Sequence, residues 1–117
     1  GNMTEALTLG TRPPVPSPDT ALQRLGSDIL STRLTADGVI YAGPCHLVGF
    51  TITGDGTNAG VALIYDHASA ASGTVVGEGR IAGTGMASVM LPGPGRWCEN
   101  GLYCDLTTAT IIVYYKR

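Results

Sequence analysis

Residues 45–66 read CHLVGFTITGDGTNAGVALIYD, in which two apolar stretches flank a glycine-rich loop. In residues 45–53 the side chains alternate with period two, with Val48, Phe50 and Ile52 on one face and Leu47, Gly49 and Thr51 on the other. In residues 61–66 Val61, Leu63 and Tyr65 alternate with Ala62 and Ile64. Period-two alternation is typical of β-strands, and glycine and asparagine in residues 54–60 provide the backbone freedom of a loop. The stretch therefore predicts two strands and a flexible connection.

The same pattern recurs on both sides of this unit. Further strands are expected at 29–35, 39–42, 74–82, 86–91, 102–106 and 110–115. Asp37-Gly38 supplies the residue types of a tight hairpin turn, so we expect residues 29–42 to form a hairpin. Gly77 and Gly79 indicate a bulge or a close backbone approach within their strand. Seven or eight short strands predict an all-β domain over residues 28–117, an antiparallel, jelly-roll-like β-sandwich.

Residues 1–27 have a different composition. Pro13, Pro14, Pro16 and Pro18 remove backbone donors and hold the chain extended, so this segment cannot join a central strand. Ser17-Pro18 followed by Gly26 predicts a helix of two turns or less. Leu22 and Leu25 of such a short helix must pack on something, either their own domain or a neighbouring subunit. We expect an extended, proline-rich N-terminal arm.

Composition limits the possible partners. A chain of 117 residues is long enough for one core, and 44% of its residues are hydrophobic. Charged residues make up 14%, well below the roughly 25% of an average soluble domain. A surface with so few charges favours a homo-oligomer or a permanently docked subunit. The seven basic residues are scattered and the net charge is -2, which argues against nucleic-acid binding.

Two further partners are not expected. No apolar stretch reaches the 18 or more residues of a membrane span. Residues 1–9 lack the basic and long apolar regions of a secretory signal, so the sequence predicts a soluble product made inside the cell.

The three cysteines allow several interpretations. Cys45, His46, Cys98 and Cys104 are the best available set for zinc, but adjacent residues of a strand point to opposite faces. Cys98 and Cys104 could form a disulfide across a turn. An odd number of cysteines without a secretory signal favours buried free thiols. We expect neither a metal nor a cofactor.

No catalytic set is evident in the sequence. Asp66, His67, Ser69 and Ser72 lie in one local loop, and neither serine has the surrounding glycines of a nucleophile elbow. The acidic residues Asp55, Asp66, Glu78, Glu99 and Asp105 fall mostly in or beside turns, where solvation is the usual state. The sequence therefore predicts a protein that is not an enzyme.

Interface residues are expected in two places. Trp97 follows a Pro-Gly loop, where an aromatic ring could contact a partner or a sugar. The candidates are Pro13, Pro14, Pro16, Leu22, Leu25, Trp97 and Tyr115.

The order of motifs resembles a known family. Those motifs are Tyr41-Ala42-Gly43-Pro44-Cys45, Thr51-Ile52-Thr53-Gly54-Asp55-Gly56, Val61–Thr74, Asn100-Gly101-Leu102-Tyr103-Cys104-Asp105-Leu106 and Ile112-Val113-Tyr114-Tyr115. Over residues 39–115 they resemble small β-sandwich structural proteins of tailed bacteriophage virions. The resemblance implies a virion structural part without catalytic residues, most simply a capsid cement or decoration protein bound to the major capsid protein or another virion protein. It favours a homotrimer. The alternative is a carbohydrate- or receptor-binding module of a tail fibre or baseplate.

Overall fold

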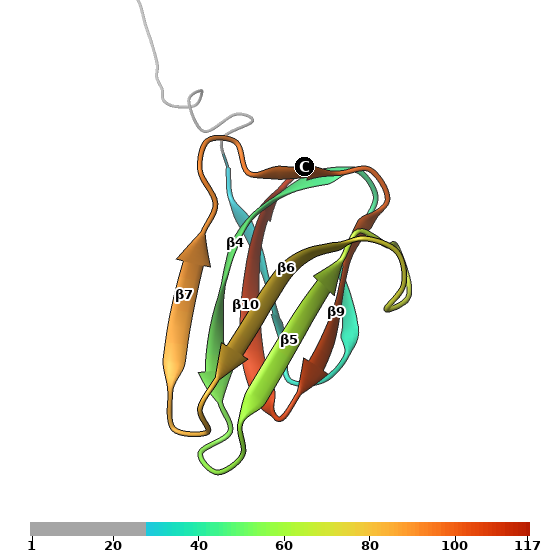
Figure 1. The fold of residues 1–117 in the computed structure, drawn as a ribbon. Helices are drawn as coiled ribbons and strands as arrows, with labels where there is room; N and C mark the ends of the chain where they lie inside the picture. Colours follow the sequence, from blue (N-terminus) through green and yellow to red (C-terminus); the bar gives the residue numbers. More distant parts are fainter. Residues whose placement is uncertain (1–27) are drawn as a thin grey trace, which may run out of the picture.

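A computed structural model describes residues 28–117, and the regular structure in this range is β-strand. The strands are β2 (Leu30–Leu34), β3 (Gly38–Ala42), β4 (Cys45–Gly54), β5 (Gly60–Tyr65), β6 (Val75–Ile81), β7 (Met86–Met90), β8 (Arg96–Cys98), β9 (Gly101–Thr107) and β10 (Ala109–Lys116). They form two antiparallel sheets packed face to face (Figure 1). One sheet has the order β2-β10-β4-β7, with β8 also paired to β4, and the other has the order β3-β9-β5-β6. The predicted all-β antiparallel sandwich is confirmed.

The strand pairs are nested along the chain. β5 pairs with β6, β4 with β7 and β8, β3 with β9, and β2 with β10. A long antiparallel hairpin rolled into two sheets gives this pairing, which is the jelly-roll arrangement. The jelly-roll-like topology expected from the sequence is therefore confirmed.

The predicted hairpin over residues 29–42 is wrong. β2 and β3 lie in different sheets, so the chain crosses from one layer to the other at residues 35–37. Gly38 is not among the glycines with positive φ, and the Asp37 carboxylate instead accepts a hydrogen bond from the Leu106 backbone N–H at 2.7 Å. Crossing lets each strand pair with an inner strand of its own sheet. An Asp-Gly signal reports a local turn preference, which here yields to this long-range pairing.

The expected faces of β4 also need a correction. Leu47 and Phe50 were assigned to opposite faces, but both are buried in the core. The reason is a β-bulge, because Tyr114 pairs with Gly49 and Tyr115 pairs with Leu47, which leaves Val48 without a partner in β10. One extra residue in a strand reverses the face of all that follow.

The core lies between the sheets. Its buried members are Ile40, Cys45, Leu47, Phe50, Ile52, Ala62, Ile64, Cys98, Leu102, Cys104, Leu106, Ala109, Ile111, Val113 and Tyr115. The Phe50 ring lies against Gly77 and Gly79 of the facing sheet, and a Cβ on Gly79 would be 2.9 Å from ring carbon Cε1. The prediction of a bulge or a close approach at these glycines is confirmed, because the Phe50 ring approaches their backbone and the β5–β6 register shifts beside Gly77, between Ile64 and Tyr65.

Two expectations about the ends of the chain have different outcomes. Tyr115, an interface candidate, is buried and stacks on Tyr41 with ring centroids 5.3 Å apart, so its side chain belongs to the core. The predicted arm, residues 1–27, lies outside the described residues with Pro13, Pro14, Pro16, Leu22 and Leu25. Its extended form and short helix stay predictions. Residues 28–117 contain no helix long and apolar enough to cross a membrane.

Candidate interaction surface

The loops at one end of the sandwich are held together by Asp66. Its carboxylate accepts hydrogen bonds from the backbone N–H groups of Glu99 (3.2 Å), Asn100 (2.9 Å) and Gly101 (3.3 Å). This ties the loop after β5 to the turn between β8 and β9, two segments far apart in sequence. Backbone donors that would otherwise lack partners are thereby satisfied. Asp66 thus has a structural role.

His67 has a similar local role. Its Nδ1 accepts hydrogen bonds from the backbone N–H groups of Ser69 and Ala70, both at 3.0 Å. These bonds close the turn after β5. Asp66 and His67, two of the four residues considered as a catalytic set, therefore accept separate groups of backbone hydrogen bonds that shape this loop.

The acidic residues at the opposite end also bind backbone. Asp55 accepts hydrogen bonds from the N–H groups of Asn58 (2.7 Å) and Thr57 (2.8 Å), and these bonds lower the pKa of its carboxyl.

Asp105 differs, because burial, followed by the neighbouring charge of Asp37, raises the pKa of its carboxyl. No group of three or more metal-binding side chains gathers anywhere in residues 28–117.

The cysteines are free and buried, as the sequence favoured. Cys98 lies opposite Cys45 in the β4–β8 pair, and all three cysteines are free, so the disulfide considered between Cys98 and Cys104 is not formed. Burial is the main cause that raises the pKa of Cys45 and Cys104 to about 12 and that of Cys98 to about 11. Such thiols stay protonated near neutral pH and are poor nucleophiles.

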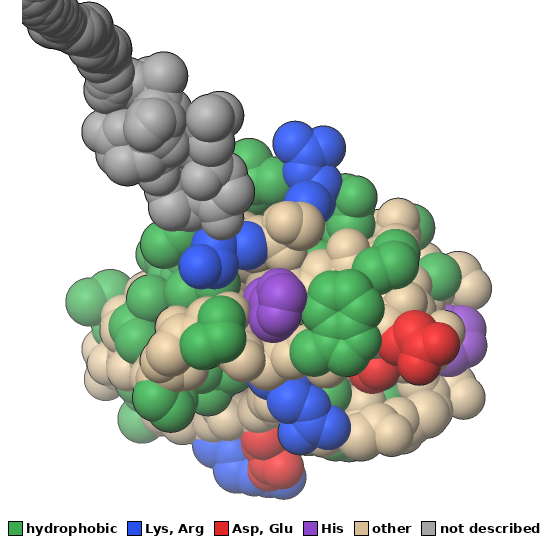
Figure 2. Space-filling view, turned by 90° about the horizontal axis from the view of Figure 1, so that it is seen from above, with side chains coloured by type: hydrophobic (Ala, Val, Ile, Leu, Met, Phe, Trp, Pro, Cys, Tyr) green, Lys and Arg blue, Asp and Glu red, His purple; other side chains and the backbone are tan. Residues whose placement is uncertain are grey.

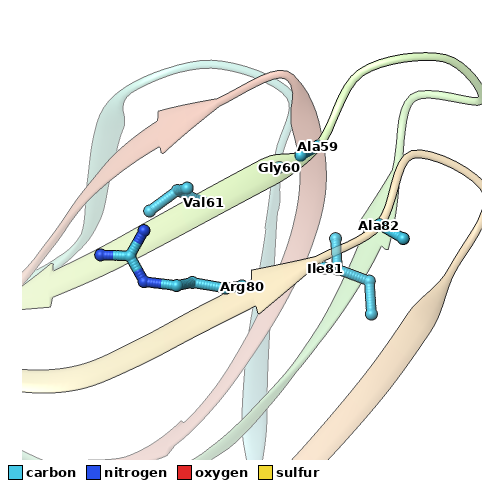
Figure 3. Close-up of a pocket in the computed structure, with 6 residues that line it drawn as sticks. All are labelled: Ala59, Gly60, Val61, Arg80, Ile81 and Ala82. Atoms are coloured by element: carbon cyan, nitrogen blue, oxygen red, sulfur yellow. The ribbon is translucent and has the colours of Figure 1, made fainter.

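An open depression lies beside the start of β5 and the end of β6. Its cavity volume is about 350 Å³, and its lining consists of Ala59, Gly60, Val61, Arg80, Ile81 and Ala82. Figure 3 shows the Arg80 side chain extending beside Val61, whereas the Ile81 side chain is directed away from these two residues. The Arg80 Nε lies 2.9 Å from the Glu78 carboxylate, so its charge is already paired. The depression does not gather the polar groups that orient a small ligand.

The most distinctive surface is a line of apolar side chains on the outer side of β7 and β8. Met86, Met90 and Trp97 are 68%, 58% and 52% exposed. Met86 pairs with Thr53, Met90 with Gly49 and Trp97 with His46, so all three lie along one border of β4. We call Met86, Met90 and Trp97 the β7–β8 ridge. Large apolar groups exposed together mark interaction sites.

Trp97 is held at one end of the ridge. Its ring meets the His46 ring edge to face, with centroids 5.0 Å apart and planes inclined by 61°. Figure 2 shows hydrophobic side chains reaching the surface at this end of the sandwich, with basic, acidic and histidine side chains among them. Trp97 was expected as an interface residue, and the structure places it at the surface.

Met86 and Met90 were not singled out from the sequence. Their exposure could not be predicted, because a methionine in a short strand can equally well face a core. A usable signal was present nonetheless, since no charged residue and no histidine occurs between Arg80 and Arg96. An edge strand inside such a stretch has no charged side chain to discourage contact.

Comparisons with known proteins found no matching family model, no matching curated protein and no matching solved structure.

Proposed function

We propose that this protein is a non-enzymatic structural component of a tailed-bacteriophage virion, a capsid cement protein that binds the assembled head and stabilises it. The single observation that carries the proposal is the β7–β8 ridge, in which three large exposed apolar side chains, including the two most exposed ones, Met86 and Met90, lie along one border of β4. The motif resemblance over residues 39–115 supports the virion context. Jelly rolls are also common among viral structural proteins.

The polar residues add support by being engaged in structural contacts. Asp66 and His67 hold loops through backbone hydrogen bonds, and the three thiols are buried. A rigid body with fixed loops and an apolar strip is suited to docking on a preformed lattice, because little conformational entropy is lost on binding. The arm and the trimer expected from the sequence remain proposals of the same kind.

The test is binding to phage heads assembled without this protein. The full chain should co-sediment with the heads in many copies, whereas a tail protein would be present in few copies. The double variant Met86→Ser/Met90→Ser should lower occupancy at least about tenfold, since each exposed apolar contact is worth on the order of 1 kcal/mol. Deleting residues 1–18 should abolish binding and leave the fold intact.

A matched control uses the other sheet. Val39 is 42% exposed on β3, so Val39→Ser removes a similar apolar contact from a different surface and should leave occupancy unchanged. Equal loss for the ridge and control variants, or full binding after the ridge is removed, would contradict the role of the ridge. Absence of any binding to heads would contradict the cement function itself.

Trp97 favours a second candidate, a carbohydrate- or receptor-binding module of a tail fibre or baseplate. A half-exposed indole fixed against an imidazole is a flat apolar platform with a polar tip, which suits stacking on a sugar ring. A glycan array with the full chain tests this function. A specific signal lost in Trp97→Ala and kept in Met86→Ser would favour it over cement.

A further inference from the structure

The free side of β7 displays a defined set of backbone groups. The Gly54 N–H donates to the Gly85 carbonyl at 2.9 Å, and the Leu91 N–H donates to the Val48 carbonyl at 2.8 Å. Gly85 and Leu91 flank β7, so both ends of the strand direct these residues toward β4. Backbone direction alternates along a strand. Ala87 and Val89 therefore also face β4, while Met86, Ser88 and Met90 direct their N–H and carbonyl groups away from it.

Among residues 28–117 no strand lies on that far side, because β7 ends the order of its sheet. Figure 1 shows β7 at the margin of the molecule. An edge with unpaired donors and acceptors is a template for another strand.

The sequence of β7 is compatible with antiparallel pairing to the same strand of a second copy. Residues 86–90 read MASVM, so a second β7 running antiparallel would place Ser88 opposite Ser88. Met86 would then face Met90, and Ala87 would face Val89, with similar sizes on both sides. Ser88 directs its backbone outward, so the central pair would exchange two hydrogen bonds, as would each Met86–Met90 pair.

The charges also permit this contact. Residues 81–95 carry no charged group, so two copies would bring no like charges together at the strand or at the loops on either side of it. On β6, the edge of the other sheet on this side, Glu78 and Arg80 point outward as an ion pair. A charged edge resists pairing with another strand, whereas an uncharged one does not.

We propose that β7 pairs antiparallel with β7 of a second copy about a two-fold axis at Ser88, which makes one continuous sheet across two molecules. The contact is closed with two copies. This two-fold dimer is an alternative to the homotrimer predicted from the sequence, which would need a different surface. The ridge lies on the outer face and the paired edge in the plane of the sheet, so docking to a capsid and pairing do not compete.

The test measures the molar mass of the full chain in solution by light scattering over a range of concentrations, without capsids. The wild type should be a dimer. Ser88→Lys puts two like charges directly opposite each other and should raise the dissociation constant at least about tenfold. Ser31→Lys, an exposed position on β2 at the other edge of the same sheet, is the matched control and should remain dimeric.

A second measurement locates the axis. Cα atoms of a hydrogen-bonded antiparallel pair are about 5.5 Å apart, within the range of a disulfide. Ser88→Cys should therefore form a covalent dimer with oxidised glutathione, while Ser31→Cys should not. The native thiols are buried and should not interfere. Their continued protection from a thiol reagent shows that each variant is folded.

Three outcomes would overturn the proposal. The first is a wild-type monomer, which is expected if the chain's own N-terminal segment covers β7. The others are a trimer whose mass Ser88→Lys does not change, and equal dissociation of the Ser88→Lys and Ser31→Lys variants. None of these results depends on binding to heads, so failure here is distinguishable from failure of the cement function.

Discussion

The two edge strands on one side of the sandwich differ in how they meet solvent. β7 ends one sheet and β6 ends the facing sheet, and both strands contact β4. β6 points Glu78 and Arg80 outward, whereas β7 exposes Met86 and Met90 without any charge. A surface ion pair adds little to stability, but charged side chains keep other strands from pairing with an edge. The difference indicates that one edge is protected and the other is available for contact.

The largest expected effect concerns the side chain that packs between the two edges. Phe50 is buried and lies on Gly77 and Gly79 of β6, while its own strand pairs with β7. Phe50→Ala should lower the free energy of unfolding by about 3–5 kcal/mol, measured in urea. Met86→Ala on the exposed edge should change it by less than about 0.5 kcal/mol. Similar costs for both would mean that Phe50 does not unite the edges.

A smaller effect is expected at Gly79. A Cβ there would lie 2.9 Å from Cε1 of Phe50, so Gly79→Ala should destabilise the protein by about 1–3 kcal/mol through overpacking. A double-mutant cycle with Phe50→Leu measures the coupling, because the smaller side chain leaves room for the new methyl group. Strictly additive costs would show that the ring is not what limits this position.

Removing the charges of β6 should make the two edges more alike. In Glu78→Ser/Arg80→Ser the free energy of unfolding should change by less than about 1 kcal/mol, since both side chains are exposed. Self-association should increase beyond that of the wild type, as measured by sedimentation velocity. An unchanged sedimentation profile would argue that the two glycines of β6, rather than its charges, prevent pairing.

The smallest change in stability is expected for Asp105, which lies on β9 at the outer face of the sheet that contains β6. Burial and Asp37 raise the pKa of Asp105, so its ionised form is disfavoured in the folded protein. The resulting cost is absent below the ordinary carboxyl pKa of 3.8 and develops as pH rises through the folded value. Asp105→Asn should therefore raise the melting temperature slightly at pH 7 and not at pH 3. A gain at both values would rule out ionisation as the cause.

Much of the fold was predictable because its signals are local. Alternation in residues 61–65 and the β-branched run before Tyr115 identify strands, and Gly77 with Gly79 indicated a close approach. Which strands pair with one another was harder to predict from the sequence. Asp37-Gly38 looks like a hairpin within any window of ten residues, yet β2 and β3 each pair with strands near the end of the chain.

The residues of the candidate surface were likewise predictable only in part. Trp97 could be suspected from its place beside a Pro-Gly loop, and its exposure agrees with that. Tyr115 could not be assigned from sequence, because residues 111–115 are apolar or aromatic at every position and do not show which alternate set faces the core. Met86 and Met90 became significant only once β7 was found at the end of its sheet.

By itself the amino-acid sequence determined that this chain forms short antiparallel strands with an apolar interior and few surface charges, since alternation, glycine content and charge are properties of neighbouring residues. The tertiary structure decided which strand faces each layer, where the bulge at Val48 reverses the pattern, and which edge is left uncovered. Those features depend on pairing between residues that are distant in the chain, and the free energy of such contacts has no local signature.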